Sequence, residues 1–194
     1  MNLSNKAFFI LSFTFLAGSP AYANNEITIT GYVIDSTCSL TSDTPGTTNG
    51  GNGDIAVILD TVPTTNFTGL NSTTGEKTFK LNLTKSDGSP CDEVTSNALK
   101  SITLIPTGDY DVNNPSILIN TLRTNAANRV NLQVLTDNGT LVTFNAPEQQ
   151  AKSPVVVDAN QKATLTYAAR YILSDNTATT QNVQAAVTYT LQYN

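Results

Sequence analysis

Residues that could do chemistry are few in this 194-residue chain, which has no histidine and only two cysteines, Cys38 and Cys91. Without an imidazole, the chain lacks the commonest general base and cannot form a Ser/His/Asp or Cys/His nucleophile pair. Two cysteines are too few for a closed zinc site. Asp109 and Asp111 lie close together, but no regular series of oxygen ligands follows them, so we interpret them as solvated turn residues. We therefore predict that the chain is not an enzyme and has no catalytic residues, no metal site and no cofactor.

The overall composition points away from nucleic acid and toward an exported β-protein. Charged residues make up 13% of the chain, the net charge is −5, and only ten residues are Lys or Arg. This charge balance gives no basic surface for nucleic acid. The chain has 31 Thr and 22 Asn. Thr favours half-exposed strand faces and Asn favours turns.

The N-terminus has the features of a secretory leader. Residues 1–6 carry one positive charge, residues 7–17 form a largely apolar run, and Ala21-Tyr22-Ala23 is a small-residue cleavage signature. The alternative, a membrane anchor, needs about 20 apolar residues, and this run is shorter. The predicted organisation is a cleaved signal peptide (1–23), an N-terminal extension (24–30) and one domain (31–194).

Export determines how the two cysteines are interpreted. In an oxidising compartment, Cys38 and Cys91 are most simply a disulfide, and they lie 53 positions apart. On the chain-entropy account, closing a loop of this size contributes on the order of 4 kcal/mol. The alternative is a pair of free thiols.

Short strands separated by turns account for most of the mature chain. Phe79, Leu81 and Leu83 alternate with polar residues over 78–84, and similar alternation covers 130–134 and 165–171. The tripeptide Asp137-Asn138-Gly139 predicts a tight hairpin turn before a returning strand over 141–144. Further strands are predicted over 24–40, leading into Cys38, over the apolar run 55–59, taken as buried, and over 102–105.

Other segments are predicted as loops or short helical turns. Residues 42–53 have turn and loop composition. The best helix candidate is 91–100, and a helical turn is a second candidate near 117–122. Neither is long enough to define the fold class, so the pattern indicates an antiparallel β-sandwich.

The most regular alternation lies at the C-terminus. Every odd position from 183 to 193 is apolar: Val183, Ala185, Val187, Tyr189, Leu191 and Tyr193. All even positions between them except Ala186 are polar. One interpretation is an ordinary final strand of a sandwich. A long apolar edge without a partner, however, invites association with another strand.

These segments together resemble pilins of the chaperone-usher fimbriae of Gram-negative bacteria. The stretch ITITGYVIDSTCSL resembles the first strand of that family, with Gly31 seven positions before Cys38. TFKLNL resembles the strand that delivers the second Cys, LTYAARYIL resembles the Ala-x-Tyr strand, and VTYTLQYN resembles the terminal motif with its penultimate Tyr193. The chain departs from the pattern at Gln181, where the family usually has Gly, and in having only seven residues between the predicted cleavage site and Gly31.

The resemblance implies a fold and a mode of assembly. The fold class would be all-β: an incomplete immunoglobulin-like sandwich that lacks its last strand and is completed by donor-strand exchange. A periplasmic chaperone would lend a strand to the odd residues of 183–193 and anchor the terminal carboxylate of Asn194. In the fibre, the extension of a neighbouring pilin subunit would replace that strand, with Ile27, Ile29 and Gly31 as the donor segment. Their alternative role is to begin the chain's own first strand.

Two functional hypotheses follow from the resemblance. The first is a structural subunit of a fimbria on the cell surface, exported through the periplasm, polymerised at an outer-membrane usher and mediating cell adhesion. The alternative is a minor or tip subunit that binds a host surface receptor or matrix. A short extension that donates poorly would suit the alternative.

Overall fold

The structure is a computed structural model that describes residues 31, 33–34, 38–123 and 129–194. Its strands, all paired antiparallel, are β1 (Ser39–Thr41), β2 (Thr47–Asn49), β3 (Ile55–Val57), β4 (Thr73–Thr84), β5 (Leu99–Pro106), β6 (Val130–Thr136), β7 (Val155–Val157), β8 (Ala163–Leu173) and β9 (Val187–Tyr193). A single α-helix in these ranges, α1 (Glu93–Ala98), and three 3-10 turns, η1 (Gly51–Gly53), η2 (Thr64–Asn66) and η3 (Pro147–Gln149), complete the elements. Within the described residues, no helix has the length and apolar character needed to span a membrane.

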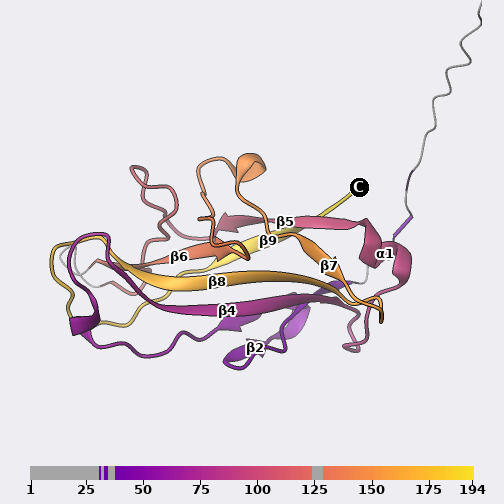
Figure 1. The fold of residues 1–194 in the computed structure, drawn as a ribbon, viewed down its shortest axis with the longest axis horizontal. Helices are drawn as coiled ribbons and strands as arrows, with labels where there is room; N and C mark the ends of the chain where they lie inside the picture. Colours follow the sequence, from indigo (N-terminus) through magenta and orange to yellow (C-terminus); the bar gives the residue numbers. More distant parts are fainter. Residues whose placement is uncertain (1–30, 32, 35–37, 124–128) are drawn as a thin grey trace, which may run out of the picture. The chain divides into compact units, whose positions relative to one another are not determined.

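One layer of the fold is a sheet in the order β1-β4-β8-β6, with β7 also paired to β8. The long strands β4 and β8 run side by side (Figure 1), with Phe79 opposite Tyr167 and Leu81 opposite Leu165. The Phe79 and Tyr167 rings stack with centroids 6.4 Å apart. The predicted apolar face of β4 is confirmed, because Phe79, Leu81 and Leu83 are all buried. On the opposite face Lys80 is exposed, but Asn82 and Thr84 are also buried, so the exposure alternates only in the first part of the segment.

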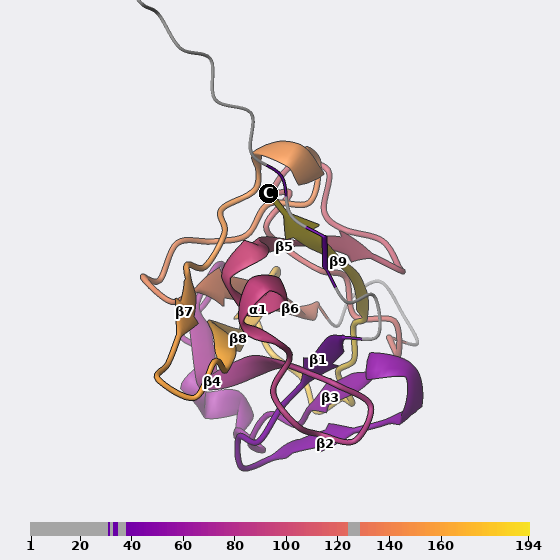
Figure 2. The ribbon, with the colours of Figure 1, turned by 90° about the vertical axis from the view of Figure 1, so that its right-hand side faces the viewer.

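The second layer is a two-stranded ribbon of β5 and β9. Viewed along the strands, this ribbon lies apart from β4 and β8 across the core (Figure 2). The buried cluster between the layers includes Leu81 and Leu165 from the sheet and Ile102 and Leu104 from the ribbon. The predicted all-β sandwich is therefore confirmed.

Within the segment predicted as a loop over 42–53, residues 47–49 form strand β2 of a third small sheet, and the rest is turn or loop. β2 pairs with β3, with Thr47 opposite Val57 and Asn49 opposite Ile55. The Gly-rich turn between them allows the chain to reverse, and Gly53 has the positive φ of +82° that glycine readily adopts. The strand predicted over 55–59 is confirmed over Ile55–Val57 as β3, but its predicted full burial is wrong. The hairpin pairs mainly with itself, so β3 is only partly buried and Ile58 is 57% exposed.

Of the predictions on either side of β6, the turn at 137–139 holds, whereas the strand over 141–144 and the helical turn near 117–122 do not. The turn at 137–139 is confirmed, with Gly139 at φ +79° and its N–H donating to the Thr136 carbonyl at 2.9 Å. Residues 141–144 make only one bridge, Leu135 to Leu141, and do not form a strand. Instead of a helical turn near 117–122, Leu118 forms an isolated bridge with Leu132. Val142 still donates its N–H back to the Val134 carbonyl of β6 at 2.9 Å, whereas the Phe144 N–H donates to the more distant Pro115 carbonyl at 2.8 Å. The return along β6 therefore stops after two residues.

Of the strand predicted over 24–40, the described residues show its last part: β1 begins at Ser39, directly after Cys38. Residues 24–30, 32 and 35–37 lie outside the described part of the chain, including Ile27 and Ile29. Gly31 is described and exposed, and a side chain built there would meet nothing within 4 Å.

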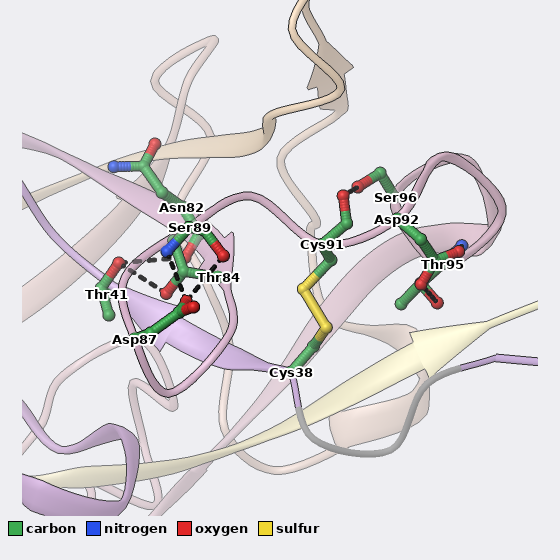
Figure 3. Close-up of a disulfide and its surroundings, with 10 residues drawn as sticks. All are labelled: Cys38, Thr41, Asn82, Thr84, Asp87, Ser89, Cys91, Asp92, Thr95 and Ser96. Carbon is green, nitrogen blue, oxygen red and sulfur yellow. Dashed lines mark hydrogen bonds between the residues drawn. A yellow bond between two sulfur atoms is a disulfide. The ribbon is translucent and has the colours of Figure 1, made fainter.

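The predicted helix after Cys91 is present as α1, and its start follows from its capping residue. Asp92 accepts the Thr95 backbone N–H at 2.9 Å and the Thr95 hydroxyl at 2.7 Å. Just upstream, Asp87 accepts the hydroxyl of Ser89 at 2.6 Å (Figure 3). The hydrogen bonds from Thr95 lower the pKa of Asp92, and those from Ser89 lower the pKa of Asp87.

These two carboxylates predict a loss of stability in acid. Their folded-state pKa values lie below the ordinary value of 3.8, so their contribution to stability is complete above that pH. It is lost as the pH falls through the lower folded-state values. We expect the denaturation midpoint of the wild-type chain to drop between pH 4 and pH 2, and to drop less in an Asp87→Asn/Asp92→Asn variant. Asparagine still caps a helix but does not titrate. Equal slopes of midpoint against pH in the two proteins would contradict the prediction.

Candidate functional site

The last strand, β9, is bonded along one edge only within the described residues. It pairs with β5, with Tyr189 opposite Leu104 and Leu191 opposite Ile102. Leu104 directs its N–H and carbonyl away from β9, to the side-chain amide of Gln150. In an antiparallel pair, two directly opposite residues that do not bond each other direct their N–H and carbonyl groups outward, each toward the outer edge of its own strand. Tyr189, and with it the other odd residues of β9, therefore directs its N–H and carbonyl to the edge away from β5, here called the outer edge.

An apolar groove lies beside this outer edge. It encloses about 730 Å³. Its floor comes from the core of both layers: Phe79, Leu81, Ile102, Leu104, Val134 and Tyr167. One wall is formed by residues 186–189 and the other by residues of the β2–β3 hairpin and its turn. Among the described residues that line it, Asp54 is the only charged one. We name this feature the β9 groove.

Side chains along β9 alternate in exposure as the sequence predicts. Thr188 and Thr190 are exposed, whereas Val187, Tyr189 and Leu191 are partly buried and pack on the core cluster. These apolar side chains are directed to the core without being fully covered. Together with the free backbone groups, they give the groove the two things that a further strand needs: ladder partners and apolar surface to bury.

The side chain of Tyr189 reaches from β9 to the opposite wall. Its hydroxyl donates to the Gly53 carbonyl at 3.1 Å and accepts the backbone N–H of Leu40 at 3.3 Å. Leu191 and Tyr193 lie beyond it and do not line the groove. Tyr189 therefore marks the end of the open part of the groove.

The predicted disulfide is present, and it joins the start of β1 to the segment before α1 (Figure 3). The Cα atoms of Cys38 and Cys91 are 6.4 Å apart. Cys91 is buried in the core cluster, and its carbonyl accepts the Ser96 hydroxyl at 3.5 Å. The bridge therefore ties the start of β1 to the segment that leads into α1.

Comparison with known proteins agrees with this geometry. No protein-family model matches the chain. The major fimbrial subunit SMF-1 of Stenotrophomonas maltophilia (strain K279a) is 31% identical over 186 residues, which cover 92% of this chain and 99% of the relative. The chain belongs to the fimbrial subunits. A type-1 fimbrial protein subunit of Serratia marcescens is 29% identical over 184 residues, covering 91% of each protein.

Solved pilin structures share the fold of this fimbrial subunit. The P pilus rod subunit PapA aligns with a TM-score of 0.52 at 15% identity, over 87% of this chain and all of PapA. A chaperone-usher pilus subunit aligns with a TM-score of 0.51 at 16% identity, over 92% of this chain and all of the other. The fold is thus the immunoglobulin-like sandwich of chaperone-usher pilins, as the resemblance implied.

The structure places the predicted acceptor residues of the fimbrial subunit at different points. Val187 and Tyr189 line the groove. Val183 and Ala185 precede β9, and Asn194 follows it and donates its N–H to the Ala98 carbonyl at 3.1 Å. The observed strand β9 therefore starts at Val187, four residues later than the strand predicted over 183–193. The groove wall in the β2–β3 hairpin was missed, although Ile55 and Val57 alternate with Ala56 after a Gly-rich turn.

The entry to β9 is held by a buried side chain that the sequence did not reveal, Asn120. Its amide donates to the Asn182 carbonyl at 2.8 Å and to the Gln181 side chain at 3.3 Å. Its side-chain oxygen accepts the backbone N–H groups of Leu122 and Gln184, each at 3.0 Å. Asn120 is 1% exposed, so water cannot replace these partners.

We expect Asn120→Ala to lower the free energy of unfolding by about 2–4 kcal/mol, because it leaves several buried backbone groups without partners. The measurement is denaturant unfolding of the mature chain followed by circular dichroism. The matched control is Asn97→Ala, at an exposed position of α1, which we expect to change stability by less than about 0.5 kcal/mol. Equal effects of the two substitutions would show that the Asn120 bonds do not hold this segment.

Proposed function

We propose that this fimbrial subunit is a structural building block of a surface fimbria that polymerises by accepting a strand into the β9 groove and that mediates cell adhesion. The observation that carries the proposal is the outer edge of β9, which no strand in the described part of the chain pairs, above an apolar floor. An added strand would bond the N–H and carbonyl groups of the odd β9 residues and place alternate side chains in the groove.

The β5 edge of the β5–β9 ribbon is blocked by a side chain, which supports addition of a strand at β9 only. Gln150 accepts the Leu104 N–H at 2.6 Å and donates to the Leu104 carbonyl at 2.9 Å. It also donates to the Thr143 carbonyl at 3.1 Å. The side-chain amide takes the place of a neighbouring strand on β5, which protects that edge from unwanted pairing. Strand addition is thereby directed to β9.

The donor and the assembly partners complete the proposal. A cleaved signal peptide (1–23) exports the chain to the periplasm, where a chaperone lends the first strand and an outer-membrane usher exchanges it for the extension (24–30) of a neighbouring subunit. Burial of Ile27 and Ile29 in a neighbour's groove contributes about 3–6 kcal/mol before the backbone ladder is counted. N-terminal sequencing of subunits from the fibre tests the cleavage site after Ala23.

Deletion of the chain in its own cell, followed by negative-stain microscopy, tests whether the chain is the structural subunit that builds the fibre shaft, here called the shaft role. We expect long fibres to disappear and to return when the chain is supplied again. Long fibres that persist unchanged without the chain would overturn the shaft role. Persistence of fibres together with loss of attachment would instead favour the alternative, a minor or tip subunit that binds a host surface receptor.

A further inference from the structure

The hydroxyl of Tyr189 bonds two backbone groups of the wall opposite β9. It accepts the N–H of Leu40, a residue 149 positions away and fully buried in β1. It donates to the carbonyl of Gly53, at the end of η1. β1 is the edge strand of the main sheet, with β4 on its other side. A backbone N–H that bonds Tyr189 points away from β4, so it belongs to the free edge of β1.

The backbone at Gly53 is shaped around this contact. A Cβ added at Gly53 would overlap the Tyr189 hydroxyl and would also approach the Cβ of Ser39 at 3.2 Å. Gly53 also has φ +82°, a conformation that other residues rarely adopt. The absence of a side chain at this position leaves room for the phenol to reach the carbonyl. Tyr189 therefore spans from β9 to both β1 and η1.

This contact occupies the path of an incoming strand. A strand added along β9 would lie about 4.8 Å from it and would continue past Tyr189 toward Leu191 and Tyr193. In that position its backbone competes with the phenol for the free edge of β1. From this geometry, and resting on the proposed function, we propose that Tyr189 is a latch that closes the end of the β9 groove in the strand-free subunit and must swing away before a strand can extend along β9.

The latch gives Tyr189 a role distinct from its place in the alternating pattern. In the strand-free subunit, the phenol satisfies a backbone donor and a backbone acceptor that would otherwise offer an edge to any passing strand. The phenol thereby slows the uptake of a donor strand into the groove. It also disfavours segments whose pairing with β9 is too weak to displace the phenol. Phenylalanine at this position keeps the ring and loses only the two hydrogen bonds.

The test compares the mature wild-type chain with Tyr189→Phe and with the control Tyr171→Phe. Tyr171 lies on β8, outside the groove. The probe is a fluorescent synthetic peptide of residues 24–36, and uptake is followed by anisotropy. We expect Tyr189→Phe to take up the peptide about 5- to 100-fold faster than wild type, the factor that two ordinary hydrogen bonds represent. The control should match wild type.

Hydrogen exchange at the Leu40 amide gives a second readout that does not depend on the peptide. We expect exchange about 2- to 10-fold faster in Tyr189→Phe and unchanged in the control. Peptide uptake by wild type at the same rate as by Tyr189→Phe, or Leu40 exchange that is equal in the two, overturns the latch. If none of the three proteins takes up peptide, strand acceptance itself fails and the latch fails with it, even where Leu40 exchange responds.

Discussion

Replacing Cys38 and Cys91 together by alanine is expected to lower the free energy of unfolding by about 4 kcal/mol, because the disulfide between them is lost. The disulfide closes a loop with a sequence separation of 53, and its loss returns that conformational freedom to the unfolded chain. A decrease of this size is a large fraction of the 5–15 kcal/mol that is typical of a single domain. The measurement is denaturant unfolding of the oxidised wild-type chain and of the double variant.

Chemical reduction provides the matched control for this experiment. Wild-type chain treated with dithiothreitol keeps both sulfur atoms but loses the bond, so its stability should approach that of the double variant. Because Cys91 is buried, any further loss in the alanine variant reports the packing of the side chains. A double variant as stable as the oxidised wild type would show that the bridge does not constrain the unfolded chain.

A carboxylate placed in the β9 groove is expected to stop assembly. Val187→Asp puts a charge against the apolar floor, where an incoming strand would exclude water from it. We expect a cost of at least about 3 kcal/mol, or roughly 100-fold less strand exchange. The side chain of Val187 is only partly buried before assembly, so the isolated subunit should fold. The measurement is the yield of fibres, together with the yield of oligomers that stay intact in detergent without heating. Both are compared at equal subunit levels in the periplasm.

Thr190→Asp is the control, because it places the same charge on the same strand but on the exposed face. We expect it to assemble like wild type. Equal loss of assembly in both variants would mean that net charge, and not the groove, limits polymerisation. Normal assembly of Val187→Asp would contradict the assignment of the β9 groove as the site of strand addition.

The sequence by itself determined the local features of this fimbrial subunit. Strand character in β4, β8 and β9 follows from alternation of apolar and polar residues, which depends only on neighbouring positions. The turn at Gly139 and the cap at Asp92 are equally local. The disulfide between Cys38 and Cys91 was predictable because there are only two cysteines to pair.

Only the tertiary structure decided which edge stays open and what lies opposite it. The blocking of β5 by Gln150 joins residues 46 positions apart, and the bond from Leu40 to Tyr189 joins residues 149 positions apart. The order of the strands likewise rests on pairings between segments far apart in the sequence, such as Thr136 with Tyr167. Such pairings depend on how whole strands pack, and no short-range pattern encodes them. The alternation in β9 therefore predicts an apolar face, but the free outer edge and the closed end of the groove follow only once the strands are placed in space.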